Sequence, residues 1–192
     1  MSSISDLARF RVDGKPVPAT VEQPAVKRRI GSILAFDQAV AATGWACLVA
    51  TEDEVTIRGL GTFKTVPITG GHEDTLLRAV QLHADFERLI DGLGPDIVAH
   101  ETPPVGARMS RPESSLVAAT ALRIAAAHAH IDVVMIGAQR AKKRLTGNGN
   151  ATKPQVREAL LSLLPSLSGH RLNENVVDAT AIGMTAIMYP DN

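Results

Sequence analysis

The sequence predicts an α/β domain built on a mixed five-stranded sheet, with three antiparallel strands followed by parallel strands, flanked by helices. Residues 32–36, 45–51 and 55–63 are strand-like segments joined by short connections, which favour an antiparallel meander. From residue 73 onward, helical and strand patterns alternate, which is typical of parallel strands linked by helices. The 192-residue chain is 45% hydrophobic and 21% charged, which suits one globular domain.

An N-terminal arm precedes this domain. Residues 1–30 contain three prolines and no sustained periodicity, so we expect a flexible arm and a domain at residues 31–192. The arm carries several charges where a signal peptide would need an apolar stretch, and no run of about 18 or more apolar residues occurs. We therefore expect a cytoplasmic protein that does not enter a membrane.

The first strand and the second belong to one stretch, ILAFDQAVAATGWACLV, at residues 33–49. Four residues suited to a buried strand precede Asp37, and Thr43 with Gly44 predicts a turn before the second strand. An acid in this position is either a turn residue or a ligand at the lip of the strand.

The later elements follow from helical spacing, caps and composition. Pro154 suits the first turn of a helix, and alanine dominates the segment that begins at Glu113. The predicted elements are a helix over 73–93, a strand over 96–100, a helix over 113–130, a buried strand over 131–136, and helices over 153–164 and 175–188.

Charge and cysteine content exclude some functions. The formal net charge is +0, so a polyanion would have to meet a local basic patch, either at residues 27–29 or at residues 140–144. Each patch is equally compatible with a solvated face. Cys47 is the sole cysteine, which rules out an intrachain disulfide and cysteine-based zinc sites.

The histidines do not predict a metal site. His100 precedes Glu101 on a strand, so we expect it to face the opposite side of the sheet as a core residue. No convincing metal-ligand spacing connects the other five, which are His72, His83, His128, His130 and His170.

Three carboxylates are the main chemical signal. Asp37 and Glu101 each end a predicted strand, and acids at neighbouring strand ends of an α/β sheet can converge on one point. Asp178 lies in a mostly apolar helix and needs a partner, for which an arginine salt bridge is the simplest choice. Three convergent carboxylates instead favour a hard cation such as Mg²⁺ or Mn²⁺, and two such ions would suit phosphodiester hydrolysis.

A fourth ligand is left open by helical spacing. Asn175 and Glu174 lie three and four residues before Asp178, so either side chain shares a helical face with it. Asn173 and Asn175 are also each suited to the N-cap of this helix.

Four motifs in order resemble the RuvC family of Holliday-junction resolvases, endonucleases with a ribonuclease H-like fold, over most of residues 33–188. They are the opening stretch with Asp37, the strand IVAHE ending in Glu101, the run TGNGNATKPQV after Arg144, and the helix NVVDATAIGM. The resemblance implies a homodimer that cuts Holliday junctions or other branched DNA and leaves 5′-phosphate and 3′-hydroxyl ends.

The resemblance also implies roles for individual residues. Two Mg²⁺ ions, for which Mn²⁺ could substitute, would be bound by Asp37, Glu101 and Asp178, with Asn175 at the fourth ligand position. Lys153 would stand near the scissile phosphate, where a fixed cation stabilises developing charge. The candidate DNA contacts are Lys142, Lys143, Arg144, Arg108 and Arg111.

The chain departs from the family pattern in three places. Gln38 and Ala39 replace a common Pro-Gly pair, Asn175 replaces a common Asp or His, and the loop after Glu101 lacks the aromatic used to wedge into bases. These changes and the extra arm suggest a divergent, phage-borne or mobile-element member, which would act in the host cytoplasm if phage-encoded.

Three other functions compete with this one. The same fold could serve an RNA-processing nuclease, and Asn175 with the missing aromatic is compatible with a non-catalytic protein that binds branched DNA. An actin-like ATPase would use residues 37–44 as its phosphate loop, but Ala39 and Ala41 stand where such a loop needs glycine.

Overall fold

The computed structural model describes residues 11–12, 15–16, 29–69, 72–103 and 112–188. Its main feature is a five-stranded sheet in the order β5-β4-β3-β6-β7. The strands β3 (Gly31–Asp37), β4 (Ala42–Ala50) and β5 (Val55–Lys64) form an antiparallel meander. The strands β6 (Ile97–Glu101) and β7 (Asp132–Ile136) extend the sheet in parallel from β3. The predicted mixed sheet is therefore confirmed.

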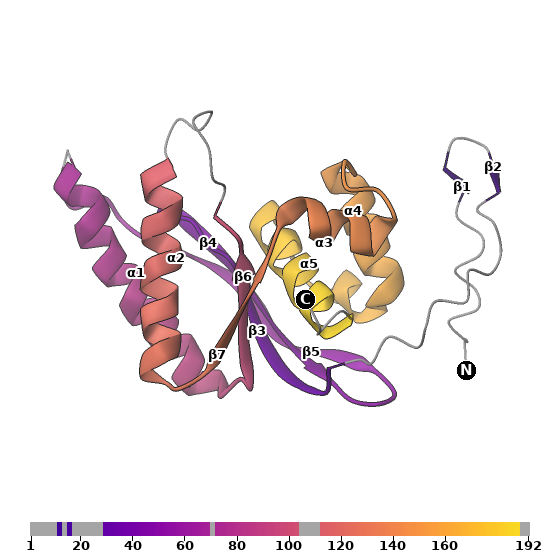
Figure 1. The fold of residues 1–192 in the computed structure, drawn as a ribbon, viewed down its shortest axis with the longest axis horizontal. Coiled ribbons are helices and arrows are strands. Elements are labelled where there is room, and N and C mark those ends of the chain that lie inside the picture. The colour runs from indigo at the N-terminus through magenta and orange to yellow at the C-terminus, as the bar shows by residue number, and fades with distance from the viewer. Residues whose placement is uncertain (1–10, 13–14, 17–28, 70–71, 104–111, 189–192) are drawn as a thin grey trace.

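Helices cover both faces of this sheet (Figure 1). The helices α1 (His72–Leu93) and α2 (Pro112–His128) pack side by side on one face. The other face carries α3 (Ala138–Thr146), α4 (Lys153–Leu163), the 3-10 helix η2 (Pro165–Gly169) and α5 (Glu174–Met188). The described part of the chain contains no helix long and apolar enough to span a membrane.

Alternation along the central strand creates two cores. Ile33 and Ala35 point to the α5 side, whereas Leu34 and Phe36 point to the side of α1 and α2. Successive strand residues face opposite sides of the sheet, so a strand that is apolar at every position must be covered on both faces. On the second side, Phe36 meets Phe86 of α1 edge-to-face, with ring centroids 5.1 Å apart.

The predicted turn at Thr43 and Gly44 is wrong, because both residues lie inside β4. The connection between β3 and β4 is residues 38–41. The Thr43 hydroxyl closes it by donating to the Ala39 carbonyl at 3.0 Å. Gly44 pairs with Asp37 across the ladder, so a residue pair typical of turns here serves a strand.

The helix α3 has no counterpart among the predicted elements. Its sequence is AQRAKKRLT, and Ala141 is its one buried residue. Without an apolar stripe there is no periodicity to detect. The basic segment at residues 140–144 is therefore a solvent-facing helix on the α5 side of the sheet.

The N-terminal arm is described only in part. Two short strands, β1 (Arg11–Val12) and β2 (Lys15–Pro16), pair with each other antiparallel where the sequence indicates no element. The backbone N–H of Arg29 donates to the Ile187 carbonyl of α5 at 3.0 Å. The other two residues of the basic patch at 27–29 lie outside the described residues.

Candidate active site

Two carboxyl groups meet where neighbouring parallel strands end. Phe36 pairs with His100 in the β3–β6 register, so Asp37 and Glu101 follow at the same edge of the sheet. Burial, reinforced by the charges of Asp178 and Glu101, raises the pKa of Asp37 to about 7. A hydrogen bond between the two side chains also raises the pKa of Asp37, and the pKa of Glu101 is raised mainly by burial and then by Asp178.

The third carboxylate and the lysine complete the cluster. Lys153 Nζ lies 3.3 Å from Asp178 Oδ2 and 2.6 Å from Glu174 Oε2. The hydrogen bond to Glu174 is the main cause of the raised pKa of Lys153, so this side chain is a fixed cation. Three acids from β3, β6 and α5 therefore lie near one another beside Lys153 of α4.

The backbone of β4 allows α5 to approach this point. A Cβ built on Gly44 would lie 2.1 Å from the Asn175 carbonyl oxygen, far inside van der Waals contact. Because Gly44 pairs with Asp37, this contact holds the first turn of α5 over the strand end that carries the acid. Gly183 has the same role further along α5, where an added Cβ would lie 3.0 Å from Leu48 Cδ1.

The first turn of α5 shows which of its asparagines is the N-cap. Asn173 is the N-cap, because its Oδ1 accepts a hydrogen bond from the Val176 N–H at 3.0 Å. Glu174 is engaged by Lys153. Asn175 sits against Gly44, next to the strand position of Asp37.

Lys153 stands at the start of α4, directly after the glycine-containing loop. Thr152 precedes it, and the Thr152 N–H donates to Gln155 Oε1 at 2.8 Å in a capping box. The capping box uses the Gln155 N–H and Pro154 has none, so the Lys153 ammonium group is the feature of this helix start that suits an oxyanion.

Gln38 is a site residue that the sequence analysis missed. This residue is only 5% exposed. Its side-chain amide bonds to the Glu101 backbone as a neighbouring strand would: Nε2 donates to the Glu101 carbonyl at 2.8 Å, and Oε1 accepts from the Glu101 N–H at 3.2 Å. Gln38 thereby extends the β3–β6 ladder and fixes the backbone of Glu101. A polar residue directly after the strand-end acid was the available signal.

The structure places some of the proposed DNA contacts. Lys142 is close enough to Glu101 for its charge to lower the pKa of that carboxyl group, although burial outweighs this effect. Lys143 and Arg144 are exposed on α3. Arg108 and Arg111 lie outside the described residues.

The histidines behave differently from expectation at one place. His100 is fully buried and its pKa is lowered mainly by that burial, as expected of a core residue. His83 and His128 are not scattered, however, because packing of α1 on α2 brings both against Glu87. Spacing along the sequence did not indicate this grouping, which the packing of α1 on α2 creates.

The chain is similar to known proteins in both its sequence and its fold. The family model for crossover junction endodeoxyribonuclease RuvC matches residues 33–186. The RuvC of Salinibacter ruber is 29% identical over 155 residues, which cover 79% of this chain and 82% of that protein. Thermus thermophilus RuvC has a TM-score of 0.72 at 21% identity, covering 83% of this chain and 95% of its own. The same protein in complex with a Holliday junction substrate gives 0.70 at 22% identity, covering 83% and 94%.

Proposed function

The chain belongs to the RuvC family of crossover junction endodeoxyribonucleases, and we propose that it is a metal-dependent nuclease that cleaves Holliday junctions or other branched DNA. One observation carries the proposal: Asp37, Glu101 and Asp178 come from three separate elements and converge beside Lys153. A stability role does not explain this cluster, because each buried acid makes its neighbours harder to ionise. The described part of the chain contains no helix that could span a membrane. We propose that the protein acts on DNA in the cytoplasm, or in the host cytoplasm if it is phage-encoded.

The donor set fits hard divalent cations. The cluster offers carboxylate oxygens, and burial together with the charges of Asp178 and Glu101 raises the pKa of Asp37 to about 7, although the charge of Lys153 lowers it. We propose that Asp37, Glu101 and Asp178 hold two Mg²⁺ ions, that Mn²⁺ can substitute, and that Asn175 supplies the fourth ligand position. Such ions would lower the pKa of water and stabilise the leaving oxygen of a phosphodiester.

The protein side chains around the cluster have separate roles in this proposal. Lys153 holds a positive charge 3.3 Å from Asp178, where it can stabilise charge that develops on the scissile phosphate. Glu174 fixes the Lys153 ammonium group from the other side. Gln38 holds Glu101 at the strand end through two hydrogen bonds, so the acid is positioned before substrate arrives.

Basic residues would guide the DNA backbone to this cluster. Lys142, Lys143 and Arg144 lie along α3, which follows directly after β7, the neighbour of Glu101 in the sheet. Because the net charge of the chain is +0, such a local stripe is the part of the surface that would attract phosphates. Arg108 and Arg111, in the segment after β6, are proposed as further phosphate contacts.

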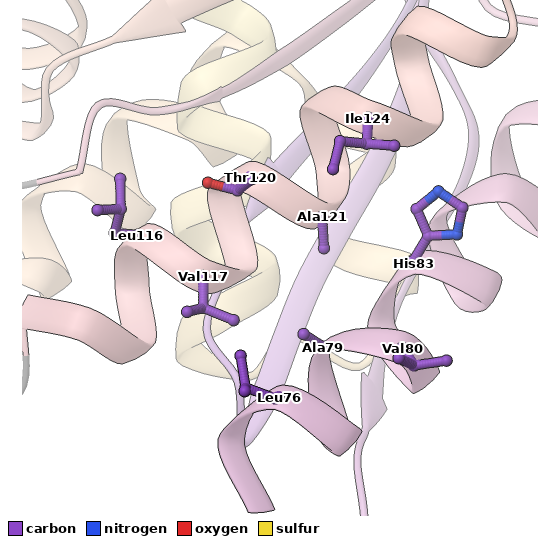
Figure 2. Close-up of a pocket in the computed structure, with 9 residues that line it drawn as sticks. All are labelled: Leu76, Ala79, Val80, His83, Leu116, Val117, Thr120, Ala121 and Ile124. Carbon is purple, nitrogen blue, oxygen red and sulfur yellow. The ribbon is translucent and has the colours of Figure 1, made fainter. Parts of the chain in front are cut away.

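A homodimer is proposed because a near-symmetric junction requires two cuts from two sites. The apolar surface between α1 and α2 supports it (Figure 2). Leu76, Val80 and Leu116 border a groove of about 450 Å³ and are 63%, 69% and 58% exposed. Apolar side chains exposed together on two helices mark an association surface, and the partner we assign to it is a second copy of the chain.

The test is cleavage of a synthetic four-way junction with Mg²⁺ and with excess chelator. We expect symmetric cuts that need the metal, leave 5′-phosphate ends and are abolished by Asp37→Asn. Linear duplex of the same sequence and structured RNA serve as control substrates. Junction binding without cutting under any metal would instead support a non-catalytic branch-binding protein, and preferential cutting of the RNA would support an RNA-processing nuclease.

A further inference from the structure

We propose that His83, Glu87 and His128 form a second metal site, for a borderline divalent transition-metal ion such as Zn²⁺. The three residues lie on α1 and α2, on the face of the sheet opposite the proposed nuclease cluster. The inference concerns binding of an ion that holds the two helices together and does not depend on the proposed cleavage activity.

The positions of the ligand atoms carry the proposal. His83 and Glu87 are four residues apart on α1 and therefore share a face, while His128 is the last residue of α2. Glu87 Oε2 lies 3.4 Å from His83 Nδ1, and Glu87 Oε1 lies 3.2 Å from His128 Nδ1. One ligand atom from each residue lies within 4.8 Å of the others.

These separations suit a tetrahedral ion. Ligands at about 2.0–2.1 Å from a tetrahedral centre are about 3.3 Å from one another, close to both nitrogen-to-oxygen distances. The two distances end on different Glu87 oxygens, so an ion between the imidazoles would be held by both oxygens, or by one of them after the carboxylate turns.

The chemistry of the donors selects a class of ion different from that of the nuclease cluster. Two imidazoles and one carboxylate suit Zn²⁺, Co²⁺ or Ni²⁺, whereas an all-oxygen set suits Mg²⁺ and Mn²⁺. The site also lies at the C-terminal end of α2, where the helix dipole favours a positive charge.

The surroundings leave the site accessible. The side chains of His83, Glu87 and His128 are 26%, 41% and 63% exposed, so an ion can enter from solvent and keep a water as its fourth ligand. Figure 2 shows His83 at one end of the apolar groove between the helices. Its Nε2 is enclosed, and Nδ1 is the nitrogen that faces Glu87.

Co²⁺ and Zn²⁺ are the probes for the binding test. The full chain with Asp37→Asn and Asp178→Asn is used, so that the nuclease cluster does not contribute. We expect one Zn²⁺ per chain by equilibrium dialysis and a visible Co²⁺ spectrum of low coordination number. Both signals should be lost in His83→Ala and in His128→Ala, and kept in His170→Ala, which removes an exposed histidine of a loop. No Co²⁺ spectrum, or one that persists without His83 and His128, would overturn the site.

Thermal unfolding provides a second readout that does not depend on activity. At a free Zn²⁺ concentration of about 100 times Kd, the midpoint should rise by roughly 5–10 °C for a chain of this size. The His128→Ala variant is the control for this measurement, because the mostly exposed side chain of His128 can be removed without disturbing the core. An equal rise in that variant would show that Zn²⁺ stabilises the chain elsewhere and would contradict the proposal.

Discussion

The two faces of the central sheet are covered in different ways. On the side of α5, an added Cβ would overlap the Asn175 carbonyl at Gly44 and press against Leu48 at Gly183, and the carboxylates converge at one end of this contact. On the side of α1 and α2, Leu76 and Val80 remain exposed, and two polar residues from the middle of α1 meet the last residue of α2. The α5 face is therefore closely packed beside the carboxylates, whereas the other face leaves large apolar side chains exposed.

Asp178→Asn should reduce activity on the scale of Asp37→Asn, because it removes one of the three acids from the tightly packed face. We expect cleavage of a four-way junction in Mg²⁺ to fall by about 1000-fold, the scale of losing one preorganised electrostatic group. Junction binding and the midpoint of urea unfolding should stay near those of the parent chain. Activity within about tenfold of the parent would remove Asp178 from the catalytic cluster.

Gly44→Ala tests whether close packing is needed at all. The new methyl group would overlap the Asn175 carbonyl, so α5 must move away from Asp37. We expect a loss of about 3 kcal/mol or more in the free energy of unfolding. Gly92→Ala is the matched control, because a Cβ there meets nothing within 4 Å and should be neutral or stabilising. Equal stabilities for the two variants would contradict this account of the α5 contact.

Gln38→Ala should impair positioning while leaving the ligands intact. Loss of both hydrogen bonds frees the Glu101 backbone, and residues that orient metal ligands are typically worth about 10–100-fold in activity or metal affinity. Cleavage rate and its Mg²⁺ dependence measure the effect. Gln139→Ala, at an exposed position of α3, should leave both unchanged. Identical behaviour of the two variants would show that Gln38 has no positioning role.

The stability of the metal-free protein should depend on pH through Asp37. Its pKa rises from 3.8 to about 7 on folding, so the folded state favours the protonated form. Below about pH 4, the Asp37 carboxyl group does not lower the free energy of unfolding. Its destabilising effect on the folded protein grows as the pH rises through about 7. Urea unfolding in chelator should therefore show a more stable protein at about pH 5 than at about pH 8. Asp37→Asn should reduce the difference in unfolding free energy between the two pH values. If that difference is unchanged, other groups cause the pH dependence of stability.

Val80→Lys should have the smallest effect on stability and a clear effect on association. Val80 is 69% exposed on the α1–α2 face, so an exposed lysine should change the free energy of unfolding by no more than about 0.5 kcal/mol. We expect analytical ultracentrifugation to show a shift from dimer to monomer. A parent chain that is monomeric at all concentrations would contradict the proposed dimer face.

Much of the fold could be predicted from local sequence. The alternating and continuous apolar runs placed every strand of the sheet, and helical spacing placed α1, α2, α4 and α5 within a few residues of their bounds. The helix α3 was not predicted, because a helix with a single buried alanine has no apolar periodicity in its sequence. Thr43 and Gly44 were misplaced in a turn because the need for glycine came from α5, which is distant in sequence.

The sequence by itself determined the residue types of the candidate cluster: acids at two strand ends, an acid in an apolar helix and a lysine after a glycine-containing loop. Their order along the chain was readable because each depends on its own local segment. Tertiary structure decided the rest. Gln38 on Glu101, Lys153 on Glu174, and His128 on Glu87 join residues 63, 21 and 41 positions apart. Contacts across such distances depend on how helices pack on the sheet, which no local pattern records.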